Sequence, residues 1–139
     1  MTWSIDLAAE TARHEPSGLV LALERGAARN LPGWGLRYRS GRPPVEIERD
    51  AGALARLASA AGDAYAEALR AVLAEAGAAL HGERFVAPLA RELGVQTRTV
   101  ERWLSGVNLI PADLPRELAA LLRARGAAVT ALLARLPHG

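Results

Sequence analysis

The chain has no cysteine and no lysine, and aromatic side chains make up only 4% of its 139 residues. Without cysteine it forms no disulfide bond and offers no thiolate for catalysis or metal binding. All 17 basic residues are arginine, and a net charge of +2 is too small to indicate nucleic-acid binding by itself. Because 50% of the residues are hydrophobic but few are aromatic, we expect a packed core of leucine, valine and alanine. The length allows one domain or two very small ones.

Long hydrophobic runs are also lacking. The sequence has no stretch of about 18 uncharged apolar residues, so it predicts no transmembrane helix. The first ten residues lack both a basic segment and a long apolar run, so they predict no signal peptide. We therefore expect a cytoplasmic protein without a membrane partner.

Patterns typical of enzymes are missing as well. The three histidines, His14, His81 and His138, are far apart in the sequence. The run from His81 to Glu83 is too sparse for a metal site. The sequence has no glycine-rich loop that would hold a phosphate, and no pattern that pairs a nucleophile with a general base. We therefore expect no catalytic activity, no metal and no cofactor.

The segment from Glu83 to Gly106, ERFVAPLARELGVQTRTVERWLSG, predicts two short helices joined by a tight turn. Helical spacing gives the first helix an apolar face of Val86, Leu89, Ala90 and Leu93. Pro88 belongs in its first turn, so this helix starts near Val86. Gly94 suits a turn that needs positive φ. Val95 is the apolar residue that fills the angle between the helices.

The second helix is predicted from about Gln96 to Ser105. Its inner face consists of Val100, Trp103 and Leu104, and its outer face consists of Gln96, Thr97, Arg98, Glu101 and Arg102. We expect the two helices to cross closely at Ala90, where a larger side chain would push them apart. Two short helices, a glycine-containing turn and an apolar wedge are the parts of a bihelical unit.

The run LARELGVQTRTVERWLSG, followed by IP and a leucine-rich helix, resembles the Cro/repressor-type helix-turn-helix of phage and bacterial regulators. The resemblance covers roughly residues 82–123. The residues at the family's small, turn and core positions are Ala90, Gly94, Val95, Val100 and Trp103. Gln96 departs from the family, which often has an N-capping serine at this position. Thr97 or Thr99 is therefore expected to help cap the second helix.

The resemblance implies that the helix from 96 to 105 enters the major groove of double-stranded DNA, with its N-terminal residues against the base edges. Arg98 is then a candidate for a bidentate contact to guanine, and Gln96 for a contact to adenine. Thr97 would touch a thymine methyl group or a phosphate, and Arg102 a base or a phosphate. The implied DNA-binding residues are Gln96, Thr97, Arg98, Glu101, Arg102, Ser105, Arg84 and Arg91.

Some of these residues have a second interpretation. Glu101 either accepts a hydrogen bond from cytosine N4 or holds a neighbouring arginine in place, and we favour the second. Arg84 and Arg91 either contact phosphate or are simply solvated. Trp103 is expected to be a core residue rather than a base-stacking one.

The first 50 residues predict a short helix followed by a small antiparallel sheet. Ser4 is a candidate N-cap for a helix from Ser4 to Glu15, which the run from Pro16 to Gly18 would end. A glycine-bounded apolar run and two alternating runs then predict three strands, at residues 19–24, 34–40 and 45–49.

The most basic part of the chain lies between Arg29 and Pro44, which contains four arginines and no acidic residue. One interpretation makes Arg37, Arg39 and Arg42 a wing-like hairpin that binds the DNA backbone or a protein partner. The other interpretation, which we favour, is an ordinary solvated strand face balanced by neighbouring glutamates.

Helices are predicted on both sides of the helix-turn-helix segment. Asp50 is a candidate N-cap for two core helices within residues 51–80, with a break at Gly62–Asp63. After a loop at 107–111, a helix from Ala112 or Asp113 has an inner face of Leu114, Leu118, Leu121 and Leu122. Gly126 is expected to interrupt it before a final amphipathic helix with Val129, Leu132, Leu133 and Leu136.

Together these patterns predict a mainly helical α+β protein. Residues 1–50 would form the sheet region, residues 51–80 connecting helices, and residues 81–139 the helix-turn-helix domain. The expected function is that of a phage-related, nucleoid-associated transcription regulator that binds specific DNA sequences. One alternative is a phage-type DNA packaging or replication protein. Another is a protein-interaction module that recruits a transcription partner.

A single unit of this kind contacts few base pairs, so we also expect a homodimer. The leucine-rich helices after Asp113 either form the dimer surface or pack within the chain. The N-terminal sheet is a candidate site for a protein partner.

Overall fold

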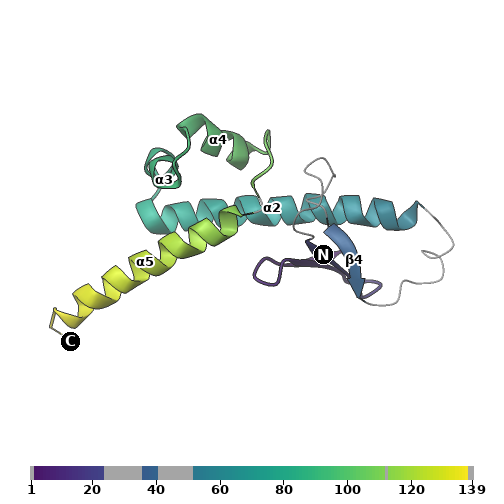
Figure 1. Cartoon of the computed structure of the whole chain (residues 1–139), viewed down its shortest axis with the longest axis horizontal. Helices are drawn as coiled ribbons and strands as arrows, with labels where there is room; N and C mark the ends of the chain where they lie inside the picture. Colours follow the sequence, from purple (N-terminus) through teal and green to yellow (C-terminus); the bar gives the residue numbers. More distant parts are fainter. Residues whose placement is uncertain (1, 24–35, 41–51, 112, 138–139) are drawn as a thin grey trace. The chain divides into compact units, whose positions relative to one another are not determined.

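The computed structural model describes residues 2–23, 36–40, 52–111 and 113–137, with the backbone alone at 23, 36–40 and 54. Strands precede helices in the chain (Figure 1). The strands are β1 (Trp3–Asp6), β2 (Thr11–His14), β3 (Leu19–Leu23) and β4 (Leu36–Ser40). The helices are α2 (Ala53–His81), α3 (Val86–Leu93), α4 (Thr97–Ser105) and α5 (Leu114–Ala134). The predicted class, α+β with a small N-terminal antiparallel sheet followed by helices, is confirmed.

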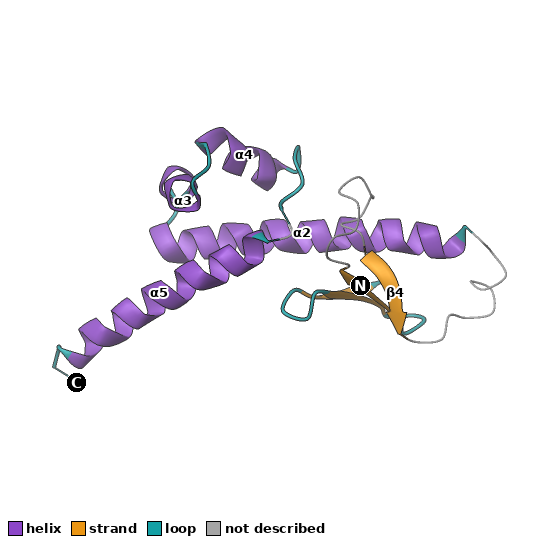
Figure 2. Ribbon diagram, in the orientation of Figure 1, coloured by secondary structure: helices purple, strands orange, loops and turns teal. Residues whose placement is uncertain are grey.

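Contacts divide the chain into two compact units, Met1–Leu69 and Arg70–Gly139. The boundary lies inside α2, which is a single helix of 29 residues. The first unit therefore contains the sheet and the beginning of α2. The second contains the end of α2 together with α3, α4 and α5 (Figure 2).

The sheet is antiparallel, and its described strands are paired in the order β1-β2-β3-β4. Ala12 pairs with Ile5 on one side and with Leu21 on the other. Alternate residues of a strand point to the same face, and Ala12, Leu19 and Leu21 are fully buried. Arg13, which points to the other face, is exposed. The sheet thus has one apolar face toward the core of its unit.

The helix predicted for residues 4–15 was wrong, because these residues form the β1–β2 hairpin. A side-chain oxygen of Asp6 accepts a hydrogen bond from the backbone N–H of Ala9 at 3.0 Å, within the turn that joins the two strands. Across the hairpin, the rings of Trp3 and His14 lie 5.0 Å apart. The alanines matched a helical spacing, but the alternation of apolar residues on β1 decided the outcome.

The strand predictions for 19–24 and 34–40 are confirmed by β3 and β4, within the residues described. The predicted strand at 45–49, the Asp50 cap and Arg42 lie outside the described residues. Arg37 and Arg39 lie in β4, where the structure describes only the backbone.

The break predicted at Gly62–Asp63 was also wrong, since α2 continues from Ala53 to His81. Glycine within a helix costs only about 1 kcal/mol relative to alanine. Gly62 is buried, and it lies on a face that continues without interruption through the rest of the helix. The buried residues that continue this face are Tyr65, Ala66, Leu69, Leu73, Ala76, Gly77 and Leu80.

The second unit has its own apolar core, to which all four of its helical segments contribute. Leu73, Ala76 and Leu80 come from α2, and Leu114 and Leu118 come from the first turns of α5. The members from α3, α4 and the loop before α5 are Leu89, Ala90, Val100, Trp103 and Ile110. None of the helices in the described part of the chain is both long and apolar enough to cross a bilayer.

Helix α5 differs from prediction in two ways. Gly126 does not interrupt it, and a single helix extends from Leu114 to Ala134 with Pro115 in its first turn. Leu122, predicted to face inward, is 39% exposed. Leu114 and Leu118 are buried as predicted, and Leu121 is half-buried. The helix therefore packs on the core of its unit only through its first turns.

Candidate nucleic-acid interface

Helix α3 and the turn after it have the predicted bihelical geometry. Leu89 and Ala90 are buried, and Val86 and Leu93 are half-buried on the same face. Gly94 ends the helix with φ of +70°, the left-handed conformation that glycine adopts without strain. The backbone N–H of Val95 donates to the carbonyl of Ala90 at 2.9 Å, which closes the turn. This turn fixes the direction in which α4 leaves.

Two contacts fasten α3 to the end of α2. The ring of Phe85 packs directly on Gly77, where an added Cβ would lie only 2.2 Å from a ring carbon. The Nε2 atom of His81 is paired with a carboxylate oxygen of Glu92. Neither contact was evident from the sequence, because each joins a residue of α2 to one in or just before α3.

Helix α4 turns its apolar side inward. Val100 is fully buried, Trp103 is 6% exposed, and Leu104 is half-buried, which confirms the predicted inner face. Gln96 is the N-cap residue and has extended backbone angles, but its side chain makes no capping hydrogen bond. Among the residues that the structure describes, Thr97 and Thr99 make no side-chain hydrogen bond, so the cap predicted from them is not observed. The first N–H groups of α4 are left without a side-chain cap.

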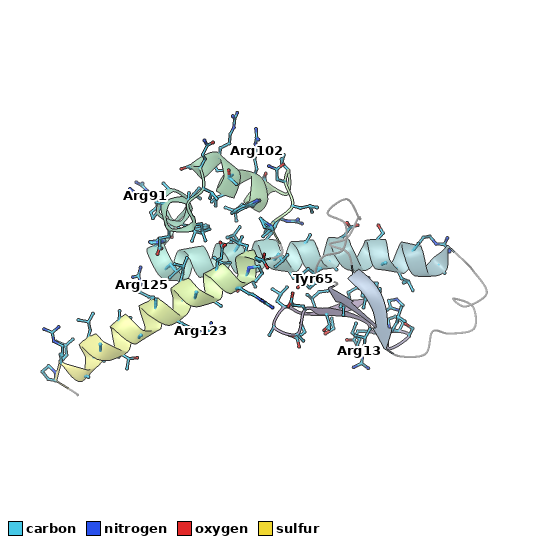
Figure 3. The ribbon with its side chains drawn as sticks, viewed as in Figure 1. Arg13, Tyr65, Arg91, Arg102, Arg123 and Arg125 are labelled. Carbon is cyan, nitrogen blue, oxygen red and sulfur yellow. The ribbon has the colours of Figure 1, made fainter. Side chains whose placement is uncertain are left out.

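All eight residues predicted to bind DNA are exposed to solvent. Those on or next to α4 are Gln96, Thr97, Arg98, Glu101, Arg102 and Ser105, and those on or before α3 are Arg84 and Arg91. Figure 3 shows Arg91 and Arg102 extending outward from α3 and α4. We call this set of eight exposed side chains, on and beside α3 and α4, the α4 face.

The arginines of the α4 face have no carboxylate partner within the part of the chain that the structure describes. Glu101 is not paired with Arg98 or with Arg102 there, so the interpretation that it holds an arginine in place has no support. Ser105 donates a hydrogen bond to the carbonyl oxygen of Arg102 at 3.2 Å. The guanidinium groups are therefore available to an external acceptor.

Sequence reasoning missed the surroundings of the C-terminus of α4. Gly106 ends this helix with φ of +82°, and the guanidinium of Arg70 from α2 lies beside it, 3.6 Å from where a Cβ would be. A cation at this end of a helix is favourable, because the helix dipole is negative there. In the following loop Val107 is 72% exposed and Leu109 is 60% exposed. The apolar loop was visible in the sequence, but the position of Arg70 depends on tertiary packing.

Within the described ranges, no three histidine, aspartate or glutamate side chains gather closely enough to hold a metal ion. The α4 face carries four guanidinium groups, the polar side chains of Gln96, Thr97 and Ser105, and the carboxylate of Glu101. Comparison with protein-family models, with curated proteins and with solved structures gives no match for this chain.

Proposed function

We propose that this protein is a transcription regulator that binds specific sequences of double-stranded DNA through the α4 face. The observation that carries the proposal is the separation of the two sides of α4. Val100 and Trp103 are buried, while Arg98 and Arg102 on the other side are exposed. A short helix presented in this way by a second helix and a glycine turn is suited to reading a groove.

The size of α4 fits the major groove. Its nine residues span about 14 Å at 1.5 Å per residue. A helix with its side chains is about 10–12 Å across, and the major groove of B-form DNA is about 12 Å wide. The N-cap residue Gln96 and the first helical residues, Thr97 and Arg98, lie at the N-terminal end of α4, so these side chains would be the ones closest to the bases.

Each side chain has a distinct role in this proposal. Arg98 has the planar fork that matches O6 and N7 of guanine, and Gln96 the amide that matches adenine. Arg84 and Arg91 lie at the first helix, from which cations reach phosphates rather than bases. The uncapped N–H groups at the start of α4 provide further donors for a phosphate oxygen.

The salt dependence of binding tests this proposal. We expect the full chain to bind a pool of labelled duplexes with an affinity that falls as salt rises, because arginines displace counterions from phosphates. Replacing Arg91 by alanine should reduce the slope of log K against log salt concentration by about 1. It should also weaken binding to all duplex sequences by a similar factor. Fluorescence anisotropy at several salt concentrations measures both quantities.

The matched control is Arg123→Ala, which removes the same charge from an exposed position on α5. This variant should leave the slope unchanged. Failure of the wild-type chain to bind duplex DNA in a salt-dependent manner would remove the basis of the proposal, and would favour a protein-interaction role for the same face.

A further inference from the structure

Beyond its first two turns, helix α5, together with the turn that follows it, carries apolar side chains that nothing in the described part of the chain covers. Five of the seven large hydrophobic side chains found exposed in the structure lie there. Their exposed fractions run from 39% to 58%, and the residues are Leu122, Val129, Leu132, Leu133 and Leu136. We call this set the α5 stripe. Single exposed leucines are common on protein surfaces, but a contiguous group indicates an interaction site.

The stripe continues the face by which α5 packs on its own unit. Leu114 and Leu118 are buried, and Leu122 follows them one turn later on the same side. Arg125 then donates a hydrogen bond from Nη2 to the carbonyl oxygen of Leu80, in the last turn of α2 (Figure 3). Because α2 ends at His81, it does not extend along the part of α5 that follows Arg125.

The spacing along this face is that of a paired helix. Counting from Leu118, the positions 122, 125, 129 and 132 of α5 follow at alternating steps of four and three residues, and Leu136, just past the end of the helix, comes four residues later. This is the heptad spacing by which two helices pack along their length. Each of these positions is apolar except Arg125, which is occupied by its bond to α2. The stripe therefore has the geometry for one further helix.

The charges around the stripe point to the identity of that helix. Its borders carry Gly126 and Ala128, and Arg123 lies on the opposite side of α5, so the borders offer almost no charge to select an acidic partner. Arg135, near the end of the helix, is the exception. A helix that fits must present an equally apolar face with uncharged borders, and the α5 stripe of another copy does so.

We propose that two copies of this chain pair through their α5 stripes to form a symmetric dimer. Such an interface is self-complementary, with the same residues contributed by both copies. Dimerisation does not require DNA binding. Its role in the cell rests on the proposed function, because the two α4 faces of a dimer would read two half-sites of the DNA.

Oligomeric state in the absence of DNA tests the pairing. The wild-type chain should show a dimer mass by analytical ultracentrifugation at micromolar concentrations. The double change Leu132→Glu and Leu133→Glu should raise the dissociation constant by about 100-fold or more, because it buries two carboxylates per copy. The control, Ala127→Glu with Ala131→Glu, adds the same charge to exposed positions on the other side of α5 and should leave the dimer intact. Circular dichroism should show the wild-type helix content in both variants.

Single cysteine substitutions can locate the interface by cross-linking, since the natural chain has no cysteine. Under mild oxidation, Val129→Cys should form a disulfide-linked dimer and Ala127→Cys should not. The pairing is refuted if the wild-type chain stays monomeric, if the glutamates on the stripe leave the dimer unchanged, or if both cysteines cross-link equally. A chain that dimerises but ignores duplex DNA refutes the proposed function alone, and a DNA-binding monomer refutes the pairing alone.

Discussion

Replacing Trp103 by alanine is expected to reduce the free energy of unfolding of the second unit by about 3–5 kcal/mol. Trp103 is among the residues buried where α4 packs on the rest of the unit, and its removal leaves a cavity there. A small domain is stable by only about 5–15 kcal/mol in total, so the change would remove a large share of the stability of this unit. Urea denaturation followed by circular dichroism measures the change.

The control for this prediction is the neighbouring residue. Arg102 precedes Trp103 in α4 but is exposed, so Arg102→Ala should change the free energy of unfolding by less than about 0.5 kcal/mol. Similar destabilisation by both changes would mean that the two sides of α4 have been assigned incorrectly. In rising urea, Trp103→Ala should lose DNA binding at the lower concentration at which it unfolds, whereas Arg102→Ala should weaken binding in a folded chain.

Replacing Arg98 by alanine is expected to weaken binding to the preferred duplex by about 5- to 150-fold, which corresponds to about 1–3 kcal/mol. Arg98 is exposed on the first turn of α4 and has no partner among the described residues, so stability should not change. Because this side chain is proposed to read a guanine, the variant should also lose its preference at one base-pair position. Selection from a random duplex pool, followed by affinity measurements, gives both results.

Arg123→Ala again provides the charge-matched comparison, and should keep both the preferred sequence and the affinity. If Arg98→Ala selects the same sequence with the same affinity as the wild type, the proposed base contact is wrong. If Arg98→Ala and Arg91→Ala both weaken every duplex equally, Arg98 contacts only the backbone.

The helix-turn-helix segment could be predicted well because its signals are local. The apolar residues of α3 and α4 recur at helical spacing within one turn of each other, and Gly94 marks the turn between them. The prediction failed at residues 4–15, where alanines fit a helix but the residues pair as two strands of a hairpin. It also failed at Gly62 and Gly126, because packing and good helix formers outweigh the modest cost of one glycine.

The surroundings of the candidate site were predictable only in part. Which residues of α4 face solvent follows from the helical period, and the structure places all of them as predicted. The pairing of His81 with Glu92 and the packing of Phe85 on Gly77 join residues separated in the sequence, and no local pattern indicates them. The apolar residues of the α5 stripe could be recognised in the sequence. Whether they pack within the chain could not be predicted, because it depends on where α2 ends.

The most direct test of the proposed DNA contact is a nuclear magnetic resonance titration of the full chain with a short duplex. Amide shifts should change most from Gln96 to Arg102 and near Arg91, and little in β1, β2 and β3. Changes confined to the sheet, with α4 unaffected, would contradict the assignment of the α4 face as the surface that binds DNA.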